Sequence, residues 1–514
     1  MLRPEAKQLN LYSDIYSRIP ETHVLKKIDS AVSFSFVNEL LADNYCTNFG
    51  RPAKEPELMV KLLLLQKLYN LSDERVIEEA GLNIAYMYFL GINPDEELPH
   101  PSLLAKFRKM RLKDTDLDDI LTEIARQCVE KSIIKATNGI TTDTTHIIAN
   151  TTKKVPERIM KQMAKKIFKA MGEKDCSIPD YKETKDYKEA RQVMKNFVEE
   201  TIEMAMTRAE EDVIEDVRKE VERANEILTS PLFIEQKGVR SLIDTDARVG
   251  YKSKTENFFG YKAEISQTTE EGIITAVGVH SGTYVDGTDF TRMHELSKIS
   301  GMDIRSFYGD KAYFKRHILD KLKEDNVKAY IPVSAGCYRI DEDLYNYNKD
   351  SDQWICVQGN ITVSKTHRIT KRKGIGEYKY YEYVFAEENC IDCPRRKECI
   401  KKAKTKAKKL NVSLNTAEYY EHNQWAKTEE FKEEYKKRSA SEWKNAELKR
   451  FHRLDRACGY GLVSVSCQAK LTAIAVNLKR IAKLVSLDLM SLFTNVSKSA
   501  LLAFIMWFPS LSYI

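Results

Sequence analysis

The segment TTDTTHIIAN at residues 141–150 places one carboxylate, Asp143, in a run of β-branched residues. Such residues favour strands, and a carboxylate buried in a strand is costly unless it is paired, hydrogen-bonded or bound to a metal. A second acid, Asp310, directly follows the predicted strand DIRSFYG, at the strand end where ligands of open α/β sheets bind. Because Mg²⁺ prefers oxygen ligands, two acids on neighbouring strands predict a magnesium site that needs a third acid.

Helical spacing supplies a third acid. In YKKRSASEWKNAELK, the residues Tyr435, Arg438, Glu442 and Lys449 follow one another at intervals of three, four and seven positions. At about 100° per residue, this spacing places all four within roughly 60° of one helix face. Their neighbours, Ser439, Lys444 and Asn445, are expected to face solvent. Spacing alone also allows a non-functional alternative, in which Glu442 and Arg438 form only a surface ion pair.

Cysteines form a second cluster. Cys390, Cys393 and Cys399 have the spacing C-x2-C-x5-C, and the fourth thiol is Cys356 or, equally by spacing, Cys337. Residues 1–23 are polar and lack the apolar core of a secretory signal, so we expect a cytoplasmic protein with reduced cysteines. Four thiolates then predict a structural Zn²⁺ site, and free thiols that happen to cluster are the alternative. Trp354 either stacks on an unpaired base or packs in a core.

Positive charge concentrates in two segments, although the formal net charge is only +6. Residues 395–409 contain nine basic residues and one acid, Glu398, and such a run suits phosphate contacts or a solvated face. The predicted amphipathic helix PSLLAKFRKMRLK presents four cations that either follow DNA phosphates or form an ordinary solvated face: Lys106, Arg108, Lys109 and Arg111.

Periodicity predicts a mixed α/β chain. Residues 1–132 have helical patterns, with a capping residue at Ser72. A strand begins near Gly139, and a second helical stretch interrupts the strand pattern. In the strand after that stretch, apolar residues alternate with Lys262, Glu264 and Ser266. Of two acids just before it, Asp244 and Asp246, the second is the candidate auxiliary metal ligand. The order strand, insertion, hairpin, helix, strand, helix, strand is that of a ribonuclease-H-like core.

The predicted domains follow from these changes of pattern. The apolar end, ALLAFIMWFPSLSYI, is short for a bilayer span and contains a proline, so we expect no membrane association. The units are a helical N-terminal domain (1–132), the first part of the ribonuclease-H-like core (133–336) with a helical insertion (151–236), a Cys-rich basic insertion (337–424), the C-terminal helices of the core (425–483) and an apolar tail (484–514).

The chain resembles DDE transposases encoded by bacterial insertion sequences. The spacing Tyr-x2-Arg-x3-Glu-x6-Lys resembles the signature of that family, and TTDTTHI and YGDKAYF are similar to its two aspartate strands. The segments GRPAKEPELMVKLLLL and SLLAKFRK are similar to the helical N-terminal domain of the IS-eleven-eighty-two type, and CVQGN and CIDCPRRKEC continue the match. The resemblance extends from about residue 9 to residue 481.

The resemblance implies an activity and its residues. Asp143, Asp310 and Glu442 are expected to hold two Mg²⁺ ions, which Mn²⁺ can replace, for in-line phosphoryl displacement. Tyr435 is expected to place the DNA strand, and Arg438 and Lys449 to contact phosphate. The implied function is cleavage and strand transfer at the ends of the element.

The implied partner is double-stranded DNA, both the terminal inverted repeats and the target, bound by a homodimer in the nucleoid. Two alternatives remain at this stage. One is a catalytically inactive or domesticated DNA-binding derivative that acts as a repressor, and the other is a host nuclease on the same fold.

Overall fold

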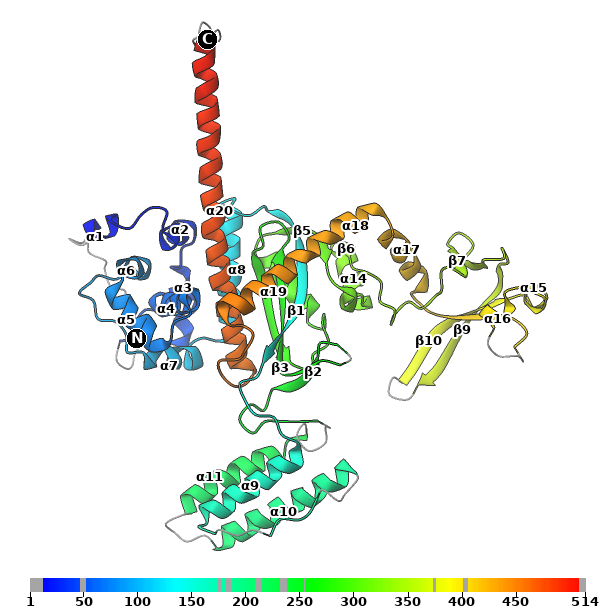
Figure 1. The fold of residues 1–514 in the computed structure, drawn as a ribbon, viewed down its shortest axis with the longest axis horizontal. Coiled ribbons are helices and arrows are strands. Elements are labelled where there is room, and N and C mark those ends of the chain that lie inside the picture. Colours follow the sequence, from blue (N-terminus) through cyan, green and yellow to red (C-terminus); the bar gives the residue numbers. More distant parts are fainter. Residues whose placement is uncertain are drawn as a thin grey trace.

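The computed structural model describes residues 13–46, 52–173, 177–181, 186–208, 214–231, 238–253, 255–372, 376–400 and 405–507. Of residues 13, 372 and 487–507 it describes the backbone alone. Part of the predicted basic segment, 401–404, and the end of the predicted apolar tail, 508–514, lie outside these ranges. Figure 1 shows the arrangement of the described elements around a central sheet.

The N-terminal region is helical, as the periodicity predicts. The side chains of Leu62, Leu63, Leu64 and Leu65 are fully buried, so this stretch is covered on all sides. The side chain of Ser72 accepts a hydrogen bond from the Arg75 amide and begins the next helix. The helices are α1 (Ser13–Ser17), α2 (Val24–Ala31), α3 (Phe36–Leu40), η1 (Ala42–Asn44), α4 (Pro56–Tyr69), α5 (Asp73–Leu82), α6 (Ile84–Leu90), α7 (Ser102–Met110) and α8 (Asp114–Glu130).

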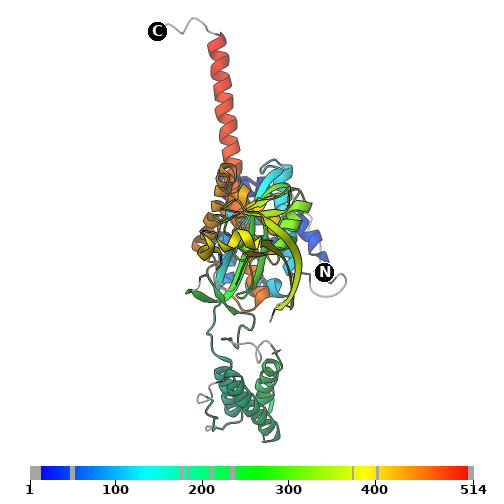
Figure 2. The ribbon, with the colours of Figure 1, turned by 90° about the vertical axis from the view of Figure 1, so that its right-hand side faces the viewer.

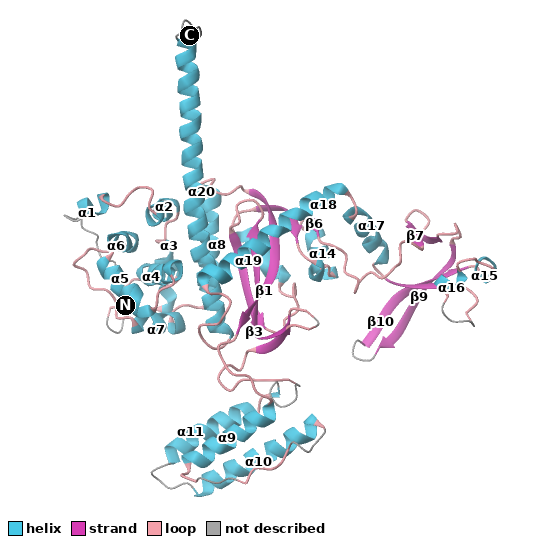
Figure 3. Cartoon of the chain, viewed as in Figure 1, coloured by secondary structure: helices cyan, strands magenta, loops and turns pink. Residues whose placement is uncertain are grey.

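The central sheet is mixed and is compatible with a ribonuclease-H-like core (Figure 3). Its strand order is β2-β3-β1-β5-β6, and β4 also pairs with β3. β1 is antiparallel to β3 and parallel to β5, and β5 is parallel to β6. The elements are β1 (Thr137–Ile148), β2 (Arg248–Tyr251), β3 (Asn257–Thr268), β4 (Ile274–Ser281), α13 (Phe290–Ile299), β5 (Asp303–Tyr308), η2 (Lys311–Tyr313), α14 (Arg316–Glu324) and β6 (Lys328–Tyr330).

Three helices follow β1 as a separate bundle. α9 (Pro156–Ala170), α10 (Tyr187–Arg208) and α11 (Ile214–Leu228) enclose their own apolar cluster. Paired backbone hydrogen bonds between Lys154 and Arg240, of 2.8 and 2.7 Å, join the two chain segments that lead to and from the bundle. Figures 1 and 2 both show the three-helix bundle on one side of the sheet, opposite the end of the C-terminal helix α20.

A β-rich unit follows β6. It has its own core around Trp354, which is fully buried and contacts Tyr383 and Tyr420 edge to face. Trp354 therefore packs in a core, and stacking on a base is not compatible with its burial. The elements are β7 (Tyr345–Asn348), β8 (Gln353–Cys356), β9 (Thr362–Arg372), β10 (Gly376–Phe385), α15 (Glu387–Ile391), α16 (Arg396–Cys399) and β11 (Lys409–Ser413).

The last helices return to the sheet: α17 (Thr416–Ala426), α18 (Glu429–Tyr435), η3 (Lys436–Arg438), α19 (Ser439–His452) and α20 (Leu462–Trp507). Within the predicted C-terminal helices of the core (425–483), the short 3₁₀ turn η3 lies between α18 and α19. The apolar stripe of α20 is buried from Leu471 to Ile481 against the N-terminal helices and β4. Its end projects beyond the other elements (Figure 2). Within the described ranges, no helix is both long and apolar enough for a membrane span.

Candidate active site

Strand register brings the two aspartates together. In the parallel pair, Thr141 of β1 lies opposite Tyr308 of β5. Asp143 and Asp310 each follow two residues later, so the two acids are in register near the edge of the sheet where β5 ends. Asp310 then begins η2, because its Oδ1 accepts a hydrogen bond of 2.8 Å from the Ala312 amide. Asp143 stays within β1, opposite Ile265 of β3.

Helix α19 brings the third acid to this edge. The hydroxyls of Thr141 and Ser441 are 2.6 Å apart and join β1 to α19. Arg438 lies between the acids, with Nη2 3.5 Å from Asp143 Oδ1 and Nη1 3.1 Å from Glu442 Oε1. The structure therefore brings Asp143 and Glu442 to one guanidinium, although the Glu442 side chain is 66% exposed.

Electrostatic interactions also place Asp310 in this group. Burial raises the pKa of Asp143 to about 6; Arg438 opposes the shift, while Asp310 and Glu442 add to it. For Arg438, burial acts to lower the pKa, but Asp143, Tyr435 and Asp310 raise it above its ordinary value. Like charges disfavour the ionised form of a carboxyl group, so Asp310 and Glu442 are both near enough to raise the pKa of Asp143.

Asn445 is a site residue that the sequence reading missed. Its Nδ2 donates a hydrogen bond of 3.0 Å to Asp143 Oδ2. Lys444, also expected in solvent, is buried. The missed signal was the interval of seven residues between Arg438 and Asn445, which places both on one face of a helix.

Tyr435 lies beside the acids. It is partly buried and stacks on Phe431 with 5.7 Å between ring centroids. Burial raises the pKa of Tyr435, and the nearby Asp310 and Asp143 raise it further.

Lys449 and His146 form a neighbouring basic pair. Lys449 Nζ is 3.2 Å from His146 Nδ1. Burial lowers the pKa of Lys449 to about 8, and Lys252 lowers it further. Burial likewise lowers the pKa of His146 to about 4, together with Lys449 and Lys252. His146 is therefore neutral near pH 7, and the positive charge of Lys449 and Lys252 beside it suits an anion such as a phosphate.

A buried carboxylate supports the site from behind. Glu264 of β3 lies opposite Thr144 and is fully buried, so the polar side of the alternation in β3 does not face solvent. Its oxygens accept hydrogen bonds from the Tyr284 hydroxyl (2.5 Å), the Tyr313 hydroxyl (2.6 Å) and the Gly287 amide (3.0 Å). Tyr313 belongs to η2, so Glu264 fastens the turn that Asp310 begins.

Asp244 and Asp246 have structural roles instead of the predicted auxiliary one. Asp246 Oδ2 accepts a hydrogen bond of 2.8 Å from the Leu462 amide, and Asp244 Oδ1 accepts one of 3.3 Å from the Gly461 amide. These bonds satisfy free amides at the start of α20.

The donor set of Asp143, Asp310 and Glu442 is chemically suited to a hard divalent cation. In the part of the chain that the structure describes, however, no three or more His, Cys, Asp or Glu side chains are arranged to hold a metal ion. The contacts of Arg438 show that it occupies a position between Asp143 and Glu442 that a bound metal ion would share.

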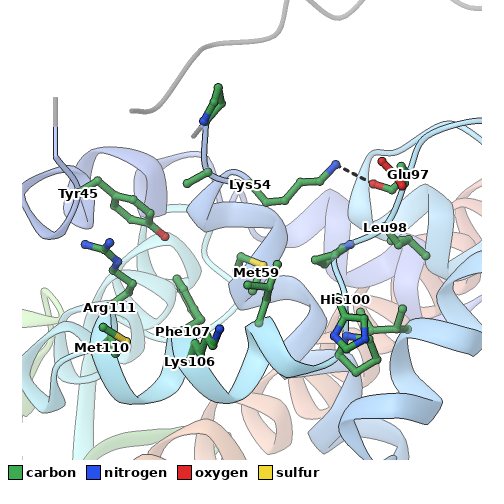
Figure 4. A pocket seen from close by; sticks show the side chains of 16 residues that line it. Tyr45, Lys54, Met59, Glu97, Leu98, His100, Lys106, Phe107, Met110 and Arg111 are labelled. Atoms are coloured by element: carbon green, nitrogen blue, oxygen red, sulfur yellow. Dashed lines mark hydrogen bonds between the residues drawn. The ribbon is translucent and has the colours of Figure 1, made fainter. Parts of the chain in front are cut away.

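The four predicted cations of α7 have different surroundings. Lys106 and Lys109 are exposed, whereas Arg108 is held by Asp73 through two bonds of 2.9 and 2.5 Å. Arg111 bonds the Asn44 carbonyl and lies over the Tyr45 ring. Lys106 and Arg111 also line a cavity of about 760 Å³ (Figure 4). The two lysines are therefore better placed for phosphate contacts than the arginines.

The structure separates the two candidates for the fourth thiol. Cys356, Cys390, Cys393 and Cys399 line one small cavity of about 30 Å³. The Sγ atom of Cys337 instead donates to the Phe314 carbonyl at 3.4 Å.

Comparison with known families gives two matches. Residues 13–110 match the family described as Transposase domain (DUF772). Residues 355–482, which contain Arg438 and Glu442 but neither aspartate, match the family described as Transposase DDE domain. No curated protein matches the chain. The two family matches support a transposase of the DDE type encoded by an insertion sequence.

Proposed function

We propose that this protein cleaves DNA at the ends of its own insertion sequence and transfers the cut strands to a target. Asp143, Asp310 and Glu442 are the proposed ligands of two Mg²⁺ ions, with Mn²⁺ as a substitute. The observation that carries the proposal is the convergence of acids from β1, the end of β5 and α19 around Arg438. When bound, the ions would activate a water or a DNA 3′-hydroxyl and stabilise the leaving oxygen.

Arg438 has two roles in this proposal. Without metal, its guanidinium offsets the charge of the acids, as the contacts with Asp143 and Glu442 indicate. When DNA enters, the same fork suits two oxygens of one phosphate, because guanidinium binds oxyanions in a bidentate way. Moving Arg438 from carboxylates to phosphate then frees the acids for metal.

The basic pair and Tyr435 position the strand. Lys449, beside His146 and influenced by Lys252, provides a partly buried positive charge for a second phosphate. Tyr435 is close enough to both aspartates for them to affect its pKa, so it borders the proposed path of the scissile strand. The exposed Lys106 and Lys109 of the proposed N-terminal DNA-binding domain extend the phosphate contacts. Because an element has two ends, the active form is a homodimer on DNA, in the nucleoid.

Substitution of Asp310 tests the proposal. Asp310→Asn keeps an oxygen that can accept the Ala312 amide, so η2 is preserved while a charge is lost. The substrate is the DNA that flanks the gene on both sides, with Mg²⁺ or Mn²⁺ present. We expect cleavage to fall by about 10³-fold or more, as for loss of a metal ligand, with DNA affinity nearly unchanged.

Asp320→Asn is the matched control, since Asp320 is half-exposed and pairs with Arg316 on the surface of α14. It should cleave like the wild type. Cleavage by Asp310→Asn at the wild-type rate would refute the assignment of the acids. Binding of both ends by the wild type without cleavage in either metal would instead identify the protein as a repressor derivative.

A further inference from the structure

Four cysteines from separate segments meet in the β-rich unit. Cys356 ends β8, Cys390 lies in α15, Cys393 follows it, and Cys399 ends α16. All four are free thiols and line the cavity of about 30 Å³ introduced above. A space of that size accommodates a water-sized guest, so the cavity has room for one small ion.

Backbone hydrogen bonds hold the cysteine-bearing turns. The Cys356 amide donates to the Asn360 carbonyl and the Gly359 amide to the Cys356 carbonyl, both at 2.8 Å. Gly359 has a φ of 79°, which favours glycine, so this tight turn depends on it. On the other side, the Arg396 amide donates to the Cys393 carbonyl at 3.0 Å.

Two cations fasten the same segment. The Arg396 guanidinium donates to the carbonyls of Cys390 and Thr405, each at 2.7 Å, and Lys408 Nζ donates to the Cys399 carbonyl at 2.8 Å. Both side chains also line the cavity. Nearby cations stabilise thiolates, which are the metal-binding form of cysteine.

The hydroxyl of Tyr345 lies in the wall of the same cavity. Tyr345 is opposite Cys356 in the β7–β8 hairpin, is 4% exposed and lines the cavity. Burial raises the pKa of Tyr345, and a hydrogen bond with Cys399, together with the nearby Cys356 and Cys390, raises it further. The hydroxyl is therefore close to the clustered thiols and can donate to a sulfur.

We propose that Cys356, Cys390, Cys393 and Cys399 bind one zinc ion as a structural site, with the Tyr345 hydroxyl donating to a ligand sulfur. Zinc prefers four soft ligands in a tetrahedron. The thiols face the cavity but are not yet arranged as ligands, so binding requires their side chains to rotate about turns that the backbone already holds. The ion would join the β7–β8 hairpin to α15 and α16. This inference is independent of the proposed DNA chemistry.

Metal analysis of the full-length protein tests the site. After purification with zinc and dialysis, we expect about one zinc per chain, and cobalt substitution should give the visible absorption bands of a tetrahedral thiolate site. Cys390→Ser should lose the metal and the cobalt bands. Cys337→Ser is the matched control and should retain both, because Cys337 contacts Phe314 instead.

If Cys390→Ser does not fold, the wild-type protein can be titrated with a mercurial, which modifies thiols. Zinc should then be released in proportion to the number of clustered thiols that are modified. Three results would overturn the proposal: no bound zinc in the wild type, equal metal loss in Cys337→Ser, or a disulfide between Cys390 and Cys393 in the freshly purified protein.

Discussion

Asn445 Nδ2 donates a hydrogen bond of 3.0 Å to Asp143 Oδ2, although 302 residues separate the two in the sequence. The Thr141–Ser441 bond joins the same strand to the same helix. Asp143 therefore has two roles: it contributes a carboxylate, and it anchors α19, the helix that carries Glu442, through the hydrogen bond from Asn445. The contacts that hold α19 against β1 therefore also bring Asp143 and Glu442 into the same site.

Asp143→Asn should change stability in a pH-dependent way. The pKa of Asp143 is about 6 in the folded protein against an ordinary 3.8, so the folded state binds this proton more tightly than the unfolded state. The resulting stabilisation is complete below about pH 4 and is lost as the pH rises to about 6. Above that pH the folded protein is up to about 3 kcal/mol less stable than it would be with a neutral side chain at this position. Asparagine is such a neutral side chain.

Urea unfolding at about pH 4 and about pH 7.5 measures the difference. The variant should be the more stable protein at the higher pH and equal to the wild type at the lower one. A variant that is less stable at both would show that the ion pair with Arg438 outweighs the burial of Asp143.

Lys449→Arg should flatten the pH dependence of DNA binding. Burial lowers the pKa of Lys449 to about 8, so the wild-type side chain loses its charge, and its attraction for phosphate, as the pH rises through that value. Arginine stays charged throughout this range. Between about pH 7 and pH 9, wild-type affinity for DNA should fall by about 3- to 10-fold more than that of the variant.

Fluorescence anisotropy at constant salt measures both affinities, with the surface change Lys432→Arg as the control. Parallel pH curves would argue against a phosphate contact at Lys449.

Tyr313→Phe should destabilise η2, the turn that Asp310 begins. The change removes the hydroxyl that donates to Glu264 at 2.6 Å, in a fully buried network. A buried carboxylate that loses a donor destabilises the fold by about 1–3 kcal/mol. Denaturant unfolding checks this value, and Tyr251→Phe, at a residue that is 65% exposed, should leave stability unchanged. Equal stability of the two variants would mean that the network is not what holds η2.

Lys470→Met should loosen the N-terminal helices from the core. Lys470 of α20 is 1% exposed, and its Nζ lies 2.8 Å from Asp114 Oδ2 and 2.9 Å from Asp118 Oδ1 of α8. Removing one partner of a buried ion pair costs about 3–5 kcal/mol, and we expect the lower end of this range because Asp114 is half-exposed and Asp118 keeps Arg292 at 3.1 Å. Thermal unfolding should show this loss, and Lys323→Met, at an exposed position of α14, should not. A loss below about 1 kcal/mol would indicate that water reaches the acids of α8.

The sequence alone determined the local elements and their order. Apolar periodicity reports which side of a helix or strand is buried, so it predicted the N-terminal helices and the alternation of strands and helices in the core. Capping chemistry is equally local, as Ser72 shows. The positions of Asp143 in one strand and Asp310 just after another could also be read from local pattern.

Tertiary structure decided which polar groups meet. Asn445 and Lys444 looked like solvent residues, and Glu264 looked like the polar side of a strand, because periodicity does not identify the element that covers a given face. Arg108 resembled a phosphate contact until Asp73 was found beside it. Spacing could not separate Cys356 from Cys337, since the chain between the cysteines can fold back in many ways. Burial of a polar side chain depends on partners that are distant in sequence, and only the packed chain brings them into contact.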